Sequence, residues 1–295
     1  MRVKRAVLTL GKLSLGGLAF YGGIILGSIL ATMLGMTAPV LPVGADVETL
    51  GQYQLLVSLL LAGSLAIVSN NLAGGFLRRW LILAVLGWIT YSLNTYLEAA
   101  IFTAYEAAST STLIMQLVAI VLCSAVVAWF FSSRDEGIST SEAFQTYFSQ
   151  NSLYQWAWRF LLVLCAFPVV YIVFGLLVRP FIINYYEQQL AGLALPGWDE
   201  IIPTLLLRSL LFLIACLPVF IFWQKSRFRL FITLGTTLFI LVGGLYMLQA
   251  YWLPVTMRVV HSLEILADSF VYTGVVVVLL LKERRHSGRV AWAAV

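Results

Sequence analysis

The sequence predicts an all-α protein: a polytopic transmembrane bundle of about eight helical spans, forming a single integral membrane domain over residues 1–295, with both termini inside. Three observations predict it. Hydrophobic residues make up 61% of the chain and charged residues only 11%, which is beyond the composition of ordinary globular domains. Eight apolar stretches are each about 20 residues long, enough to cross a bilayer. Basic residues gather in the turns on one side of these stretches.

The expected spans follow one another along the chain and are separated by polar or proline-containing turns. Each is long enough to cross the hydrocarbon core at a rise of about 1.5 Å per residue. Their approximate bounds are 14–34, 54–73, 81–103, 113–131, 160–178, 204–223, 230–249 and 259–281. The pattern favours a multi-pass protein of a plasma membrane, the inner membrane of a prokaryote.

The distribution of Lys and Arg predicts the orientation, because cytoplasmic loops of membrane proteins carry an excess of basic residues. With eight spans, both termini and the turns after the even-numbered spans share one side. That side holds every basic residue except Arg179, Arg208 and Arg258, which predicts cytoplasmic termini. The net charge of +5 does not indicate nucleic-acid binding, because the basic residues are dispersed over separate turns.

The first span is expected to be a permanent helix and not a cleaved signal peptide. Its apolar region is longer than a signal sequence requires. Small residues also recur in it at every fourth position, at Gly23, Gly27, Ala31 and Gly35. Such a stripe lets a second helix approach closely, so it is also a candidate contact for a membrane-protein partner.

Two connections are long enough to have structure of their own. Ser139 and Glu142 are spaced as a capping box, which predicts a short helix lying in the membrane interface. The segment from Pro180 to Pro203 is expected as an outer connection, either a lid over the bundle or a plain interfacial loop. Each half of the chain has four spans, as in transporters built from repeats, but the residue similarity between the halves is slight.

The best functional clue is a polar stripe in the last span. Arg258, His261, Glu264 and Asp268 recur every three or four residues and share one helix face. Ionisable side chains are costly in lipid and indicate either a functional site or a buried network. At comparable depth, the sequence places Asn94 and Glu98 in the third span, Arg179 at the end of the fifth and Arg208 in the sixth.

Several chemistries can be tested against this layer of charges. One histidine within the spans is too few for a zinc or haem site, and the arginines would compete with a metal ion for the carboxylates. The sequence contains neither a phosphate-binding loop nor a dinucleotide-binding turn. Its three cysteines lie in apolar segments without metal-ligand spacing. We therefore expect no metal and no cofactor, and we predict no catalytic residue.

The sequence thus predicts an outward-facing charged cavity in a transporter or lipid-handling protein for an anionic or amphipathic ligand, with membrane lipids as partners. The expected anion holders are Arg208, Arg258 and Arg179. The expected proton-titrating or pairing groups are Asn94, Glu98, His261, Glu264 and Asp268. Two alternatives stay open: an intramembrane enzyme for lipid-linked substrates at the outer leaflet, and a non-catalytic subunit of a larger membrane complex. A purely structural charge network competes with all of these site assignments.

Overall fold

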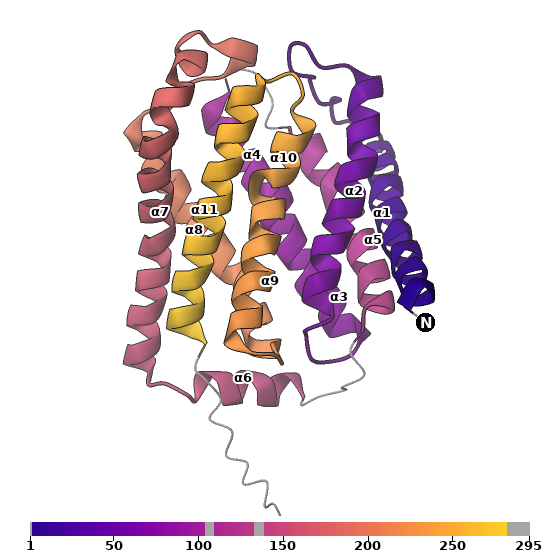
Figure 1. Ribbon diagram of the computed structural model, residues 1–295, viewed down its shortest axis with the longest axis vertical. Helices are drawn as coiled ribbons and strands as arrows, with labels where there is room; N and C mark the ends of the chain where they lie inside the picture. The colour runs from indigo at the N-terminus through magenta and orange to yellow at the C-terminus, as the bar shows by residue number, and fades with distance from the viewer. Residues whose placement is uncertain (1, 104–108, 133–138, 282–295) are drawn as a thin grey trace, which may run out of the picture.

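The computed structural model describes residues 2–103, 109–132 and 139–281, and within them eight helical segments are long and apolar enough to cross a membrane. They form one elongated bundle (Figure 1). In chain order they are α1 (Arg2–Met33), α2 (Val47–Ser69), α3 to α4 (Phe76–Phe102), α5 (Thr110–Phe130), α7 (Leu153–Glu187), α8 (Trp198–Phe222), α9 to α10 (Arg227–Gln249) and α11 (Val255–Leu280). The all-α membrane bundle is confirmed, and each expected span overlaps one of these segments. Arg134 and the basic residues after Leu281 lie outside the described residues.

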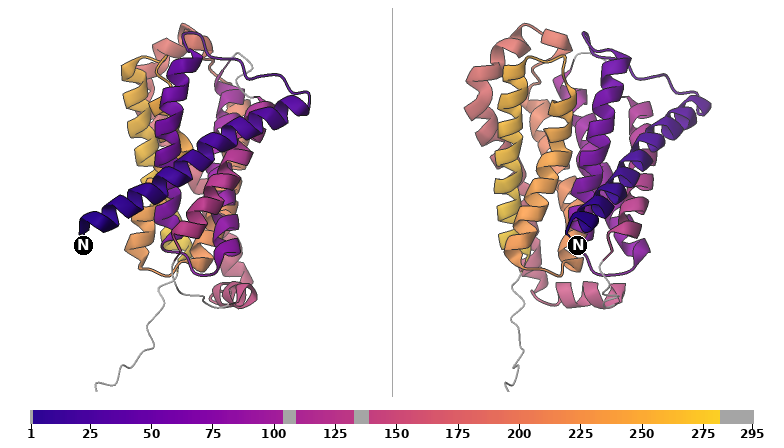
Figure 2. Two further views of the ribbon diagram at one scale, coloured as in Figure 1. Left: turned by 90° about the vertical axis from the view of Figure 1, so that its right-hand side faces the viewer. Right: turned by 45° about the vertical axis from the view of Figure 1, so that its right-hand side comes forward.

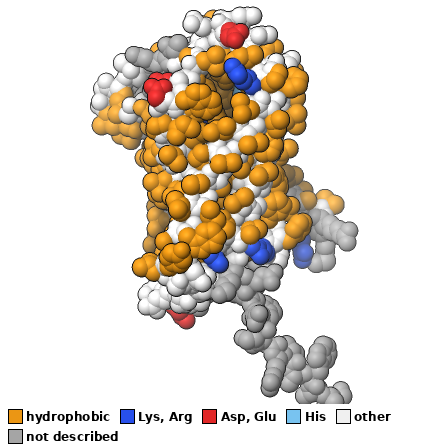
Figure 3. All heavy atoms as spheres, turned by 90° about the vertical axis from the view of Figure 1, so that its left-hand side faces the viewer, with side chains coloured by type: hydrophobic (Ala, Val, Ile, Leu, Met, Phe, Trp, Pro, Cys, Tyr) orange, Lys and Arg blue, Asp and Glu red, His pale blue; other side chains and the backbone are white. Residues whose placement is uncertain are grey.

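The bundle has two ends, which we call the terminal end and the distal end. α1 begins and α11 ends at the terminal end, whereas the connections 34–46 and 188–197 lie at the distal end (Figure 1). Large apolar side chains cover the outside between them, including Leu177 (62% exposed) and Val278 (65%). On the face drawn in Figure 3, charged side chains gather near the two ends and leave a hydrophobic band between them. Such a surface suits lipid and not water.

A short helix, α6 (Thr140–Phe148), crosses the terminal end of the bundle (Figure 1). The hydroxyl of Ser139 accepts a hydrogen bond from the backbone N–H of Glu142 at 3.2 Å, which caps the helix as the sequence predicts. Its aromatic face turns toward the bundle, where the Tyr147 hydroxyl donates to the Leu280 carbonyl at 3.0 Å. Burial raises the pKa of Tyr147 above its ordinary value, so this hydroxyl stays protonated and remains a donor.

The glycine stripe of α1 is used inside the chain. α1 runs obliquely across the bundle (Figure 2) and packs against α5. A Cβ atom added at Gly27 would lie 2.5 Å from the Cα atom of Met115, and Gly23 meets the backbone of Ala119 as closely. These two glycines therefore seat a helix of the same chain, as small residues do at close crossings in membranes. Gly35 lies beyond the helix end, with a left-handed φ of 73°.

Two of the spans contain a π-helical segment at mid-length. η1 (Trp88–Leu93) joins α3 (Phe76–Gly87) to α4 (Asn94–Phe102), and η3 (Ile240–Gly244) joins α9 (Arg227–Phe239) to α10 (Leu245–Gln249). The two π segments contact each other in the middle of the bundle. Such segments change the direction in which the following turn presents its side chains, and they are frequent at functional sites.

The two halves of the chain pack alike. α1 contacts α2 and α5 as α7 contacts α8 and α11, and the halves meet through α2 with α9 and α3 with α8. At the terminal end Leu72 forms an antiparallel bridge with Trp223, which is 151 residues further along. Its two hydrogen bonds are equivalent under that offset: Ala73 N–H donates to Phe222 O at 2.9 Å, and Gln224 N–H to Asn71 O at 3.2 Å. The structure therefore contains an internal repeat of four spans, which the sequence left open.

The outer connection is shorter than the sequence predicts. α7 continues through Pro180 to Glu187 and α8 begins at Trp198, so only 188–197 connects them, with a short 3-10 turn, η2, at Leu190–Gly192. Pro180 and Pro203, which bound the expected connection, both lie inside helices, because within a membrane bundle neighbouring groups compensate for the missing N–H of proline and the helix continues. Pro168 and Pro218 also lie inside helices.

Candidate functional site

A cavity lies in the distal half of the bundle, enclosed by α4, α7, α8, α10 and α11. Its volume is about 130 Å³, of the same order as the roughly 150 Å³ apolar cavity that accommodates benzene. Apolar and aromatic side chains form most of its wall. The acidic, basic and histidine side chains that line it are Glu98, Arg208, His261, Glu264 and Asp268. An apolar pocket with a few convergent polar groups is the usual form of a ligand site.

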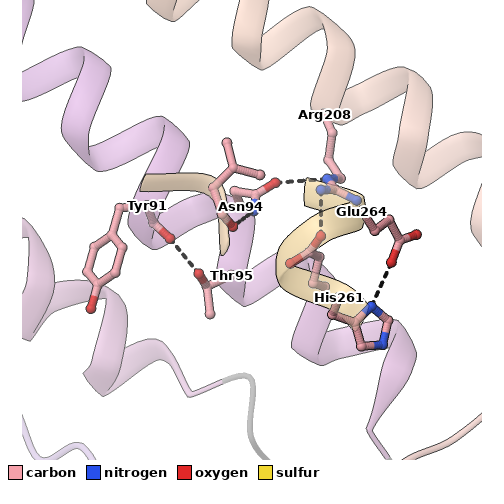
Figure 4. Close-up of polar contacts among 8 residues, drawn as sticks. Tyr91, Asn94, Thr95, Arg208, His261 and Glu264 are labelled. Atoms are coloured by element: carbon pink, nitrogen blue, oxygen red, sulfur yellow. Dashed lines mark hydrogen bonds and ion pairs between the residues drawn. The ribbon is translucent and has the colours of Figure 1, made fainter. Parts of the chain in front are cut away.

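Arg208 on α8 is held by α4 and is only 2% exposed. Its Nε donates to Oδ1 of Asn94 at 2.8 Å, and its Nη2 donates to Oε1 of Glu98 at 2.5 Å (Figure 4). Asn94 and Glu98 are four residues apart, so successive turns of α4 present both acceptors on one side. The guanidinium also lies 5.0 Å from the ring centroid of Phe167, where the aromatic face stabilises its charge.

Asn94 is oriented by the second π segment. Its Nδ2 donates to the Val242 carbonyl of η3 at 3.0 Å, which leaves its Oδ1 facing Arg208. Tyr91, one turn earlier, points away from this group in Figure 4, and its ring packs 6.2 Å from that of Phe20. The site thus joins α4 and α8 to the meeting point of the two π segments.

His261 and Glu264 form a second polar pair on α11. His261 Nδ1 lies 2.7 Å from Oε2 of Glu264, and the Tyr186 hydroxyl lies 3.5 Å from His261 Nε2. By sequence position, Arg208 and Glu264 lie at similar depth on separate helices. They do not pair in the structure, where Arg208 bonds to Glu98 and Glu264 turns toward His261 on its own helix. Equal depth does not fix the direction in which a side chain leaves its helix.

Among the charged side chains that line the cavity, two buried atoms have no hydrogen-bond partner within the described part of the chain. One is Oδ1 of Asp268, whose side chain is 7% exposed, and the other is Nη1 of Arg208. Buried polar atoms are nearly always hydrogen-bonded, so each unpaired one requires an explanation. Both belong to residues that line the same cavity, where a bound molecule could meet them.

Two of the three expected anion holders lie elsewhere. Arg258 donates from Nε to the Met247 carbonyl at 2.9 Å and from Nη2 to the Leu248 carbonyl at 3.0 Å, and it lines a separate apolar groove on the outside of α10 and α11. Arg179 is exposed on α7 and does not line the cavity. Only Arg208 remains, so the expected cluster of three arginines is not assembled. At about 100° per residue Arg258 lies at the edge of the stripe, roughly 120° from Glu264, and its guanidinium turns to the carbonyls at the end of α10.

The wall of the cavity includes aromatic residues that no sequence pattern identified as part of a site. Tyr186, within the segment expected as an outer connection, lines the cavity together with Tyr171 and Phe212. Their helical spacing resembles that of ordinary core residues. The only usable signal was that aromatic residues cluster on the helices that carry the charges.

The connection 188–197 covers the distal side of the cavity. Ala191 and Leu193 line it, and Ala194 N–H donates to the Phe102 carbonyl at 2.9 Å, which ties the connection to α4. Gln189 and Ala191 both have left-handed backbone angles, with φ of 52° and 51°. For residues with a Cβ atom such angles store strain, and they occur preferentially at binding sites and switch regions.

No group of three or more His, Cys, Asp or Glu side chains in the described part of the chain is arranged to hold a metal ion. Compared with known proteins, the chain matches no family model, no curated protein and no solved structure.

Proposed function

We propose that the protein is a transporter or lipid-handling protein that binds an amphipathic molecule in the distal cavity. The observation that carries the proposal is the pair of unpartnered buried atoms, Asp268 Oδ1 and Arg208 Nη1, in a cavity with mostly apolar walls. Leaving a buried polar group unsatisfied costs about 1–3 kcal/mol, so a purely structural network would be expected to satisfy both. An amphipathic ligand offers polar groups to these atoms and an apolar part to the walls.

The internal repeat supports a functional interpretation of the charges. Under the offset of 151 residues, Glu98 corresponds to Gln249, whose Nε2 donates to Oε1 of Gln54 on α2 at 2.8 Å. Between α10 and α2 the repeat thus has an uncharged pair, where α4 and α8 are joined by Glu98 with Arg208. Hydrogen bonds and small residues suffice to hold membrane helices together. The charged pair is therefore more than this packing requires.

The orientation rule adds a direction to the proposal. Cytoplasmic termini place the distal end, and with it the cavity, on the outer side of the membrane. A ligand would then enter from the outer leaflet or the external medium. The strained connection 188–197 is the segment whose displacement would open the distal side of the cavity.

An intramembrane enzyme is the second candidate, and a specific observation favours it. His261 Nδ1 and Glu264 Oε2 are 2.7 Å apart beside the unpaired Asp268, an arrangement in which the carboxylate can orient an imidazole that takes up a proton. An enzyme would convert the bound molecule covalently, whereas a transporter would release it unchanged.

The test is a variant with a large side chain at a residue of the connection 188–197 that lines the cavity. We expect Ala191→Trp to exclude the ligand, and we use Leu195→Trp as the control, because Leu195 is 55% exposed on the same connection and does not line the cavity. Native mass spectrometry of protein purified in mild detergent should show a bound molecule on the unmodified protein and on Leu195→Trp, and at least about ten-fold less on Ala191→Trp. Equal occupancy in all three would contradict the proposal. A bound molecule whose mass changes on incubation would select the enzyme.

A further inference from the structure

We propose that the cavity selects a ligand with a cationic group, and that Asp268 binds this group. The inference rests on the proposed function and adds the sign of the ligand's charge. It replaces the anionic ligand expected from the sequence, which depended on three arginines in one layer.

The charges that line the cavity do not balance. Arg208 is neutralised by Glu98, with Nη2 and Oε1 at 2.5 Å, and Glu264 has His261 as its neighbour at 2.7 Å. Asp268 has no ion-pair partner among the described residues, and its Oδ1 has no hydrogen bond. Even with His261 protonated, one arginine and one histidine face three carboxylates. A cation completes this balance, whereas an anion would enlarge the imbalance in a medium where unpaired charge is costly.

The surroundings of Asp268 suit an organic cation. Tyr272 follows Asp268 by one helical turn, and its ring centroid lies 5.5 Å from that of Phe167 and 6.3 Å from that of Phe212. All three rings line the cavity. Aromatic faces attract ammonium groups, most strongly where water is excluded. The cavity thus combines a carboxylate with three rings, two of which, Phe167 and Phe212, also contact the Arg208 guanidinium. This lining matches a substituted ammonium joined to an apolar body.

Arg208 does not reverse this preference. Its guanidinium lies among aromatic rings, 5.0 Å from the centroid of Phe167 and 5.2 Å from that of Tyr171, and its charge is matched by Glu98. An anion that reached Nη1 would also meet the fields of Glu98 and Asp268. The free Nη1 is better suited to a neutral acceptor, such as an ester or hydroxyl oxygen of the same ligand.

Protonation of any of the carboxylates or of His261 in the cavity should weaken the binding of a cation. The titratable and charged side chains that share the cavity with Asp268 are Glu98 on α4, Tyr171 and Tyr186 on α7, Arg208 on α8, Tyr246 on α10, and His261, Glu264 and Tyr272 on α11. Protonation of any carboxylate removes a negative charge, and protonation of His261 adds a positive one. Affinity for a cation should therefore fall as the pH is lowered.

The experiment uses three single-ring probes of nearly equal size with different charge: phenyltrimethylammonium, tert-butylbenzene and benzenesulfonate. Binding to the purified full-length protein is measured by equilibrium dialysis at pH 8 and pH 5. We expect phenyltrimethylammonium to bind at least about ten-fold more tightly than the other two, and less tightly at pH 5. Asp268→Asn should abolish this preference and leave tert-butylbenzene binding unchanged, whereas Asp268→Glu should retain it.

The matched control is Glu187→Gln, because Glu187 is exposed at the end of α7 and does not line the cavity. It should bind all three probes as the unmodified protein does. Tighter binding of benzenesulfonate than of phenyltrimethylammonium would overturn the inference of a cationic ligand. The proposal that the cavity binds an amphipathic molecule would stand. Equal binding of all three, or an unchanged preference in Asp268→Asn, would also overturn the inference of a cationic ligand. Failure of all three probes to bind would overturn the proposed function itself.

Discussion

At the residue scale, the central feature of the site is the burial of Arg208 and its ion pair with Glu98. The guanidinium is 2% exposed, while the Glu98 side chain beside it is 32% exposed. Removing one partner of a buried ion pair lowers stability mainly because the other charge is left buried without a partner. Replacing Glu98 and replacing Arg208 should therefore lower stability by different amounts, and the difference in exposure between the two side chains decides which loss is larger.

We expect Glu98→Gln to destabilise the protein more than Arg208→Leu does. Glu98→Gln leaves a buried guanidinium uncompensated, a loss of about 3–5 kcal/mol, whereas Arg208→Leu leaves a carboxylate that water can partly reach. The double variant Glu98→Gln with Arg208→Leu should recover much of the loss. Thermal unfolding in detergent of the four proteins measures this.

The same four proteins separate structure from binding. The double variant should be stable yet fail to retain a ligand in native mass spectrometry, because Arg208 Nη1 is part of the proposed site. Full recovery of stability together with unchanged ligand binding would mean that the charged pair only supports the fold.

At the element scale, the close crossing of α1 and α5 is set by glycine. A Cβ atom at Gly27 would lie 2.5 Å from Cα of Met115, a backbone atom that cannot rotate away. Gly22 on the same helix has no atom within 4 Å of the corresponding position. The two glycines therefore offer a matched comparison within one helix.

We expect Gly27→Leu to lower stability by about 1–3 kcal/mol, the usual cost of overpacking, because α1 must move away from α5. Gly22→Leu should lie within about 0.5 kcal/mol of the unmodified protein, as surface changes usually do. Chemical unfolding in mixed micelles provides both values. A similar loss in the two variants would show that the crossing does not depend on the stripe.

At the scale of the whole molecule, two halves that pack alike differ in what they enclose. In the first half α1 packs directly against the backbone of α5 through Gly23 and Gly27. In the second half Gly175 of α7 faces the Glu264 carboxylate of α11, and a Cβ atom added at Gly175 would lie 3.5 Å from Oε1 of Glu264. The cavity lies between α7, α8, α10 and α11 of the second half and α4 of the first. The repeat provides the scaffold, and its asymmetry provides the site.

The orientation of the whole bundle is open to direct measurement. In a background without Cys123, Cys165 and Cys216, a cysteine at Glu187 should react with an impermeant thiol reagent added to intact cells, because it lies at the distal end. A cysteine at Arg227, at the terminal end, should react only after the cells are permeabilised. The reverse pattern would invert the topology and place the cavity on the cytoplasmic side.

The sequence by itself determined the membrane class, the eight spans and the short capped helix at 140–148. These features depend on composition, apolar length and residue spacing, all of which are local along the chain. It also identified Glu98, Asn94, Arg208, His261, Glu264 and Asp268 as polar residues of the bundle, because charge within an apolar stretch is visible without a partner.

Only the tertiary structure decided which of these groups meet. Arg208 and Glu98 are 110 residues apart, and their contact depends on how α4 and α8 are rotated about their axes. A π segment before Asn94 alters that rotation, and no hydrophobic pattern in the sequence announces it. The same reason explains why the sequence grouped Arg258 with the cavity and did not single out Asp268, whose Oδ1 has no hydrogen bond within the described residues. Depth follows from position along a helix, but partnership follows from direction around it, which packing sets.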